Sequence, residues 1–300
     1  MLRAIPEPPV SVQVGPGDDA AVVQGQAITV DALVEGVHWN DRLGPEDVGY
    51  KSVAVSVSDL AAMGARPAWV VLALSVPAPV DLAWVEALAT GVGSACRSFA
   101  VALVGGDVTR SPGPRYLSVT MGGPCPRPVT RSGAHAGDWL WVTGTLGLAG
   151  AGYLLDAPPP EALEALRRPR PPLPFALALA DAGLASAMMD LSDGLATDLP
   201  RLCAASGLGG QVDPRSLPLH PTLGRIEDPV PLQVGAGDDY ELMFTAPPQA
   251  EEQVRALAEK NGVAVTAIGS LTSPGPVELI GRPWPPSFSH FGASTPGEVR

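Results

Sequence analysis

The hydrophobic and polar positions along the first half of the chain predict strands alternating with helices. Short apolar runs that end at glycine, proline or an acid are typical of strands, and apolar residues recurring every three to four positions are typical of helices. Strands are predicted over 20–23, 27–31, 68–76, 100–104 and 115–122, with helices over 45–63 and 82–99. This order predicts an α+β domain with helices on one face.

The segment 45–63 carries two competing periodicities. Val53, Val55 and Val57 alternate as in a strand, whereas Val48, Val55 and Asp59 share one helical face. Pro45 suits the first turn of a helix, and Gly64 suits the position after its last turn. These start and stop residues favour a helix.

After Thr130 the chain becomes turn-rich, which places a domain boundary near residue 133. The predicted domains are therefore 1–133 and 134–300. In the second domain a Pro/Arg-rich connector is expected over 158–174 and an irregular tail over 282–300. Strands are predicted over 139–143, 186–189, 210–212, 240–245 and, as the last one, 263–268, with helices over 147–155, 175–182 and 249–261. The whole chain is thus expected to be a two-domain α+β and α/β protein.

Composition excludes several classes of protein. The formal net charge of −12 opposes binding to a nucleic-acid backbone, which needs clustered cations. No stretch approaches the ~20 apolar residues that span a bilayer, and the N-terminus lacks an apolar signal core, so we expect a soluble, cytoplasmic protein. The three cysteines are far apart, which argues against disulfides and a zinc site.

Six aspartates share a setting that suggests metal binding. A single aspartate after a strand or turn more often caps a helix or closes a loop. Six such aspartates beside glycines favour a shared cation site. They are Asp19, Asp31, Asp59, Asp107, Asp190 and Asp238. Two carboxylates 4 Å apart repel by ~4 kcal/mol at an effective dielectric near 20, so convergence of the group requires metal. Mg²⁺ prefers such oxygen ligands and commonly bridges them to phosphates.

The chain has no Walker loop and no kinase glycine-rich loop with its strand lysine. A nucleotide must therefore be held through metals, glycine-rich backbone and arginines.

Seven sequence blocks, in this order, resemble those of the thiamine-monophosphate kinase family in the aminoimidazole ribonucleotide (AIR) synthetase superfamily. They are GDDAAVV (17–23), TVDALVEGVHW (29–39), KSVAVSVSDLAAMGARPAW (51–69), VGGDVTR (104–110), TRSGAHAGDWLWVTG (130–144), MDLSDGLATDL (189–199) and GDDYELMFT (237–245). The resemblance implies two AIR synthetase-like (PurM-like) domains and a homodimer formed through N-domain strands. It also implies ATP-dependent phosphorylation of thiamine monophosphate to thiamine diphosphate with several Mg²⁺ ions.

The same resemblance implies roles for individual residues. The implied metal ligands are Asp19, Thr29, Val30 through its backbone carbonyl, Asp31, Asp59, Asp107, Asp190 and Asp193. The implied ATP contacts are Gly106, Asp107, Arg131 and Ser192. The implied contacts to thiamine phosphate are His38, Asp238 and Phe288. No side chain stands out as a covalent nucleophile, so direct transfer of the phosphoryl group is expected.

The chain departs from the family pattern at three places. Val30 stands where a hydroxyl residue is common, Asp238 replaces a glutamate, and the segment before Gly17 is short. Two alternatives remain: another ATP-using enzyme of the superfamily, and a non-catalytic regulator that binds nucleotide and metal. Selenophosphate synthetase is disfavoured because residues 1–20 contain neither the cysteine nor the lysine it would need.

Overall fold

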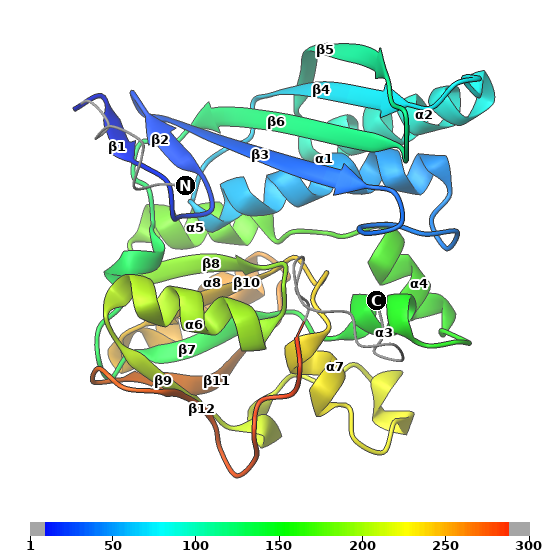
Figure 1. Cartoon of the computed structure of the whole chain (residues 1–300). Helices are drawn as coiled ribbons and strands as arrows, with labels where there is room; N and C mark the ends of the chain where they lie inside the picture. Colours follow the sequence, from blue (N-terminus) through cyan, green and yellow to red (C-terminus); the bar gives the residue numbers. More distant parts are fainter. Residues whose placement is uncertain (1–9, 288–300) are drawn as a thin grey trace.

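The computed structural model describes residues 10–287, which form two six-stranded sheets stacked on either side of helix α1 (Figure 1). The first sheet has the strand order β1-β2-β3-β6-β4-β5, and only β4 and β5 run parallel. Its strands are β1 (Val12–Val14), β2 (Ala21–Val23), β3 (Gln26–Val34), β4 (Trp69–Val76), β5 (Ala102–Arg110) and β6 (Tyr116–Pro124). Helices α1 (Pro45–Ala62) and α2 (Leu82–Phe99) complete this half.

Helix α1 confirms the helical interpretation of its mixed periodicity. Pro45 begins it, and the Asp47 carboxylate accepts the Gly44 amide hydrogen at 3.2 Å, which caps its first turn. The alternating valines are nevertheless buried, because α1 packs against β3 and β6 on one side and against β8 and β10 on the other. Residues on nearly every face of this helix therefore contact protein or the site between the sheets.

The second sheet has the order β12-β9-β11-β7-β10-β8. Its strands are β7 (Trp139–Thr143), β8 (Ala187–Leu191), β9 (Gly209–Val212), β10 (Glu241–Ala246), β11 (Val265–Thr272) and β12 (Val277–Leu279). The helices of this half are α3 (Leu148–Leu154), α4 (Pro160–Arg167), α5 (Leu173–Ala182), α6 (Leu195–Ser206), α7 (Val230–Gly235) and α8 (Glu251–Lys260).

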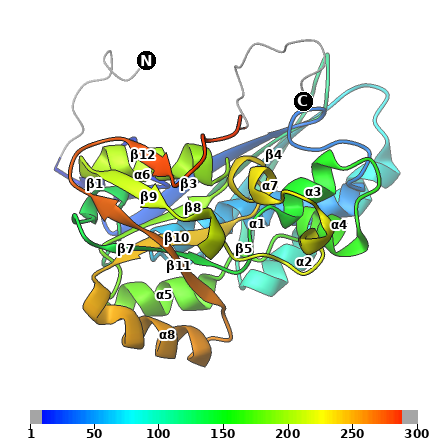
Figure 2. The same cartoon turned by 90° about the horizontal axis from the view of Figure 1, so that it is seen from below.

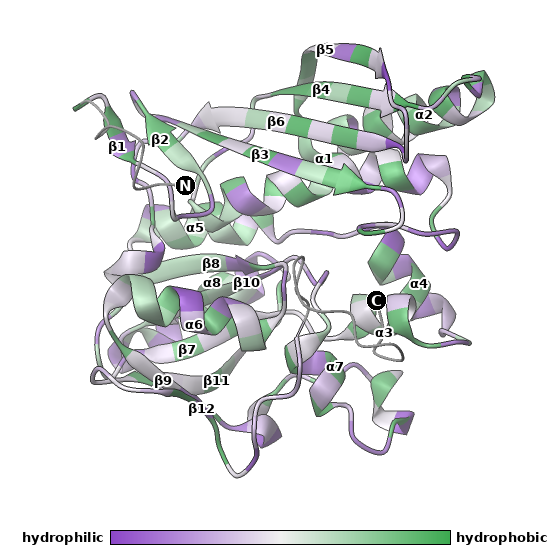
Figure 3. Cartoon of the chain, viewed as in Figure 1, coloured by the Kyte–Doolittle hydropathy of each residue, from purple (hydrophilic) through white to green (hydrophobic). Residues whose placement is uncertain are grey.

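The strand alternation of β7 and β10 divides the core of this half into two layers. Val142 and Met243 pack toward α6, whereas Trp141 and Phe244 pack toward α5 and α8. Figure 2 shows α6 on one side of the sheet and α5 with α8 on the other. Figure 3 shows hydrophobic residues along the strands of both sheets, as this two-sided burial requires.

Three sequence predictions are corrected by the structure. Strand β5 runs through Gly105–Gly106–Asp107 to Arg110 instead of ending before them, so Asp107 lies within the strand. Helix α4 lies inside the expected connector, since PEALEALR combines a proline start with strong helix formers. Strand β12 follows the segment predicted to be the last strand.

No helix in the described part of the chain is long and apolar enough to cross a bilayer.

Candidate functional site

Carboxylates from four separate elements converge between the two sheets. Asp19 precedes β2, Asp59 lies one turn before the end of α1, and Asp190 lies on β8. One ligand oxygen from each of these three lies within 4.8 Å of the others. Asp31 on β3 is close enough to raise the pKa of Asp59 by charge repulsion. The predicted convergence of Asp19, Asp31, Asp59 and Asp190 is therefore present in the fold.

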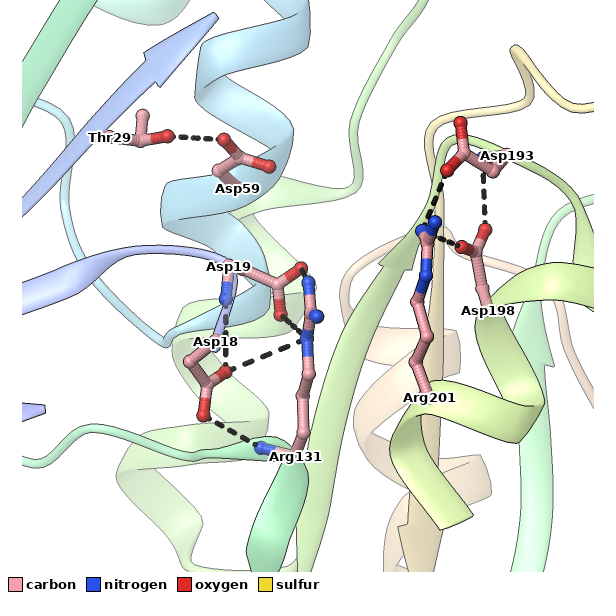
Figure 4. A network of polar contacts seen from close by, with 8 residues as sticks. All are labelled: Asp18, Asp19, Thr29, Asp59, Arg131, Asp193, Asp198 and Arg201. Carbon is pink, nitrogen blue, oxygen red and sulfur yellow. Dashed lines mark hydrogen bonds and ion pairs between the residues drawn. The ribbon is translucent and has the colours of Figure 1, made fainter. Parts of the chain in front are cut away.

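Hydroxyl groups fix the orientation of two of these acids. Thr29 on β3 donates a hydrogen bond from its hydroxyl to Asp59, and Ser56 on α1 donates to Asp31 at 2.6 Å (Figure 4 shows the former pair). Thr29 and Asp31 share the face of β3 that turns toward α1, because strand residues two apart point the same way. The strand and the helix thus each supply a hydroxyl group that hydrogen-bonds to a carboxylate of the other.

Burial disfavours the charged form of the carboxylates in this cluster. Loss of hydration raises the pKa of Asp59 and Asp190 well above the ordinary aspartate value, and repulsion from the neighbouring carboxylates adds to the effect. Burial likewise raises the pKa of Asp19 and Asp31. Asp190 is 3% exposed, and its Oδ2 is a buried oxygen that has no hydrogen-bond partner within residues 10–287.

Arg131 is the protein's own counter-charge to the cluster. It lies in a 3₁₀ turn, Arg131–Gly133, between β6 and β7. Its guanidinium donates to both oxygens of Asp19, from Nη2 at 2.6 Å and from Nε at 3.3 Å, and its backbone amide donates to Asp18 at 3.2 Å (Figure 4). This forked contact holds the turn before β2 against the 3₁₀ turn that connects the two sheets.

A second arginine organises the loop that follows β8. Arg201 on α6 donates from Nη1 to Asp193 at 2.7 Å and to Asp198 at 3.0 Å (Figure 4). Asp198 also accepts the Asp193 amide hydrogen at 3.0 Å, and its burial raises its pKa to about 7. The loop carrying Ser192 and Asp193 is therefore anchored by Asp198 and Arg201, which the sequence patterns did not single out.

A cavity of about 470 Å³ adjoins the cluster, and both sheets contribute to its wall. Most of the predicted site residues line it, namely Val30, Asp31, His38, Asp59, Asp190, Ser192, Asp193 and Asp238. His38 accepts the Val34 amide hydrogen on Nδ1 at 2.9 Å, so its neutral ring carries its proton on Nε2. Val30 is 65% exposed. Because its side chain has no oxygen, only its backbone carbonyl could act as an oxygen ligand.

Two predicted site residues among the described ones lie apart from both the carboxylate cluster and the cavity of their own chain. Gly106 and Asp107 are on β5, the exposed edge strand of the first sheet. A Cβ on Gly106 would come within 2.3 Å of the Leu72 carbonyl oxygen, so close strand packing alone requires a glycine there. Asp107 pairs with Ala73. The roles of both residues stay predictions, and Phe288 lies outside the described residues.

Lys51 is a cavity residue that the sequence patterns missed. It lies on α1, and its ammonium contacts the Asp238 carboxylate at 2.5 Å. Its spacing of eight residues from Asp59 could have indicated a shared helical face. Its partner, however, is 187 residues away along the chain.

Comparisons with known proteins agree with this architecture. Residues 17–124 match the model of the N-terminal domain of AIR synthase related proteins, and residues 135–282 match that of their C-terminal domain. Thiamine-monophosphate kinase of Escherichia coli is 39% identical over 285 residues, covering 88% of this chain and 86% of the relative.

Two solved structures are similar over almost their whole length. The crystal structure of thiamine-monophosphate kinase from Stenotrophomonas maltophilia has a TM-score of 0.79 at 36% identity, covering 91% of this chain and 92% of that one. AaThiL complexed with AMPPCP and TMP has a TM-score of 0.81 at 30% identity, covering 92% and 91%. This chain therefore belongs to the thiamine-monophosphate kinase family, within the AIR synthase related proteins.

Proposed function

We propose that this protein transfers the γ-phosphoryl group of ATP directly to thiamine monophosphate, giving thiamine diphosphate. The observation that carries the proposal is the buried carboxylate cluster beside a cavity large enough for a small phosphorylated substrate. Family membership supports it, and AaThiL was solved with AMPPCP and TMP. Phosphoryl transfer depends mainly on positioning and charge neutralisation, so no covalent protein intermediate is needed.

The donor set suits several Mg²⁺ ions. Oxygens of Asp19, Asp59 and Asp190 lie within 4.8 Å of one another, and one oxygen of Asp190 has no protein partner in the described chain. Asp31 and the Asp193 loop would complete this ligand set, with Thr29 holding Asp59. When bound, the ions would neutralise phosphate charge and align the two phosphates.

The chain's own residues would orient the two substrates. Arg131 already donates from Nε and Nη2 to Asp19, so its Nη1 group is the one that would donate to a phosphate oxygen. Ser192 lies on the anchored loop at the cavity. His38, whose ring is fixed by the Val34 amide, is placed to contact the acceptor. Enclosure of these groups between two sheets limits the access of water that would otherwise hydrolyse ATP.

Asp59→Asn tests the reaction and the metal role together. Wild-type protein with ATP, Mg²⁺ and thiamine monophosphate should form thiamine diphosphate, measured by chromatography. The variant should lose about a thousandfold in kcat/KM, because the metals lose a central carboxylate. Its thermal stability without metal should not fall, since the substitution removes one of several repelling charges.

Asp41→Asn, which changes an exposed carboxylate, is the matched control and should retain wild-type activity. Absence of product with wild-type protein would contradict the proposed reaction. Full activity in Asp59→Asn would contradict only the metal assignment.

We further propose that the enzyme is a cytoplasmic homodimer. Valine and leucine side chains on the first sheet are more than half exposed at Val30, Leu103, Val104 and Val108. Paired residues on neighbouring strands point to the same face of the sheet, and these pairs run from Asp107 through Ala73 and Ser118 to Ala32. Ala32 follows Asp31 along β3, so Asp107 lies on the face opposite to that of Asp31. Val30 lies two residues from Ala32 and so shares the face of Asp107, whereas Leu103 and Val108 point to the opposite face. Contact between two sheets through the face of Val30 and Asp107 would cover Val30 and bring Asp107 to the partner's site.

A further inference from the structure

A buried lysine lies inside a cavity whose other charged residues are mainly acids. Lys51 is one of only two lysines in the chain and is 1% exposed. It is the only lysine or arginine among the described residues that line the cavity, where five aspartates also lie. Its Nζ contacts Asp238 Oδ2 at 2.5 Å and lies 5.9 Å from the centroid of the Tyr240 ring.

The Lys51–Asp238 pair and the metal cluster lie at different positions along the same face of helix α1. Lys51, Val55 and Asp59 all line the cavity at intervals of four residues, so they share one face of the helix. A rise of 1.5 Å per residue places Lys51 ~12 Å along the axis from Asp59. The cavity therefore has a carboxylate end at Asp59 and an opposite end at Lys51, where Tyr153 and Tyr240 add aromatic surface.

The Lys51–Asp238 pair is better suited to binding than to stability. Burying an ion pair gains little net stability over packed apolar side chains. An ammonium has three donors, and Asp238 is its only hydrogen-bond acceptor among residues 10–287. Asp238 and Tyr240 both have positive φ angles, of 66° and 50°, and such strained backbone is concentrated at functional sites.

Neutralisation by Lys51 changes what Asp238 can do. A carboxylate already paired with an ammonium is a poor counter-ion for the thiazolium cation of the substrate. It remains a good hydrogen-bond acceptor at a fixed position, beside an ammonium that donates to no other residue in the described part of the chain. The pair thus offers one acceptor and one donor side by side.

We propose that Lys51 is a specificity-determining residue that, together with Asp238, recognises the aminopyrimidine edge of the acceptor. That edge has an amino group, which donates, next to a ring nitrogen, which accepts. Asp238 accepts from the amino group and Lys51 donates to the ring nitrogen, while the phosphate end of the molecule extends along α1 toward Asp59. This inference rests on the proposed kinase activity and adds the side chain that selects its acceptor.

The first test uses wild-type protein and an altered substrate. In thiamine monophosphate whose pyrimidine amino group is replaced by a carbonyl oxygen, the donor and acceptor positions are exchanged. The wild-type enzyme should discriminate against this analogue by at least ~100-fold in kcat/KM, because both pyrimidine hydrogen bonds would be mismatched. Equal use of the two substrates would overturn the proposal, whereas failure with thiamine monophosphate itself would instead count against the kinase activity.

The second test removes the ammonium. Lys51→Met should lower kcat/KM for thiamine monophosphate about 10- to 100-fold, mainly through KM, and should reduce discrimination against the carbonyl analogue. The KM for ATP should stay within about twofold, which a general loss of folding would not allow. Lys260→Met, at the other and exposed lysine, is the matched control and should behave as wild type. Unchanged discrimination in Lys51→Met would overturn the proposal, and if this variant does not fold, the analogue test on wild-type protein still decides.

Discussion

At the scale of single residues, Glu241 is a half-buried acid outside the metal cluster. It begins β10 and accepts the Thr143 hydroxyl hydrogen at 2.5 Å, while the Thr143 oxygen accepts the Leu242 amide hydrogen at 2.8 Å. Burial raises the pKa of Glu241 from 4.5 to about 7, although the Thr143 hydrogen bond opposes the change. Its protonation is therefore coupled to folding.

This coupling predicts a pH-dependent loss of stability. Between pH 4.5 and 7 the unfolded chain releases the Glu241 proton while the folded chain retains it, so the free energy of unfolding falls as the pH rises. The fall should be about 3 kcal/mol from this residue. Urea denaturation of metal-free wild type and Glu241→Gln should show the difference between their free energies changing by that amount across the interval.

Glu278→Gln removes an exposed carboxyl from β12 and serves as the control. Its stability should run parallel to that of wild type from pH 4.5 to 8. Parallel curves for Glu241→Gln as well would show that Glu241 titrates normally.

Residue types and spacings predicted much of the site. Asp19, Asp31 and Asp190 follow a turn or end an apolar run, Asp59 lies on a helix face, and the fold brings the four together. Lys51 was not predicted, because its partner comes from the second domain and no local pattern records that contact. Arg201 and Asp198 were missed for a similar reason, since their role depends on the loop that precedes α6.

At the scale of elements, the crossing of α1 and α2 fixes the position of the helix that carries Lys51 and Asp59. The two helices approach closely through one glycine on each. A Cβ on Gly49 would lie 2.1 Å from the Leu88 carbonyl oxygen, and one on Gly91 would lie 1.9 Å from that of Glu46. The backbones of the two helices are in direct contact at this crossing, so neither helix can accommodate an added side chain by a small local shift.

Gly91→Ala should therefore destabilise the protein by about 2 kcal/mol or more, because the added methyl group must push the helices apart. It should also lower activity by displacing α1. Gly93→Ala, on the same helix, would meet only the flexible end of Arg97 at 3.4 Å and should stabilise by up to about 1 kcal/mol. Thermal and urea unfolding of both variants measure the difference, and equal effects would refute the close-packing explanation.

Helices and strands were predicted correctly where residue patterns marked their ends, and incorrectly where glycines typical of an end lay inside a strand. Helix α2 was predicted over its observed range, 82–99, because its apolar spacing is regular, and the structure adds that the Asp81 side chain caps its first turn. The glycines of β5 suggested an end to the strand, but the pairing with β4 continues through them to Arg110. Local residue preferences could not reveal this, because the close approach of Leu72 depends on tertiary pairing.

At the scale of the whole molecule, one chain leaves the proposed site incomplete. Asp107 is separated from the carboxylate cluster by the thickness of the first sheet and by three strand spacings. Val30, which is 65% exposed, lies on the same face of the sheet as Asp107. In a two-fold dimer the same patch meets itself, so each chain would give its Asp107 to the other.

Mixing two inactive variants tests this exchange. Asp59→Asn and Asp107→Asn should each be inactive alone. Unfolded together and refolded, they form mixed dimers in which one site has two substitutions and the other has none, so activity should return to about a quarter of the wild-type level. If Asp107 acted within its own chain, every mixed dimer would have one substitution in each site and no activity would return. Light scattering on Val30→Asp gives an independent check, because a charge on the face that carries Asp107 should convert the dimer to monomers.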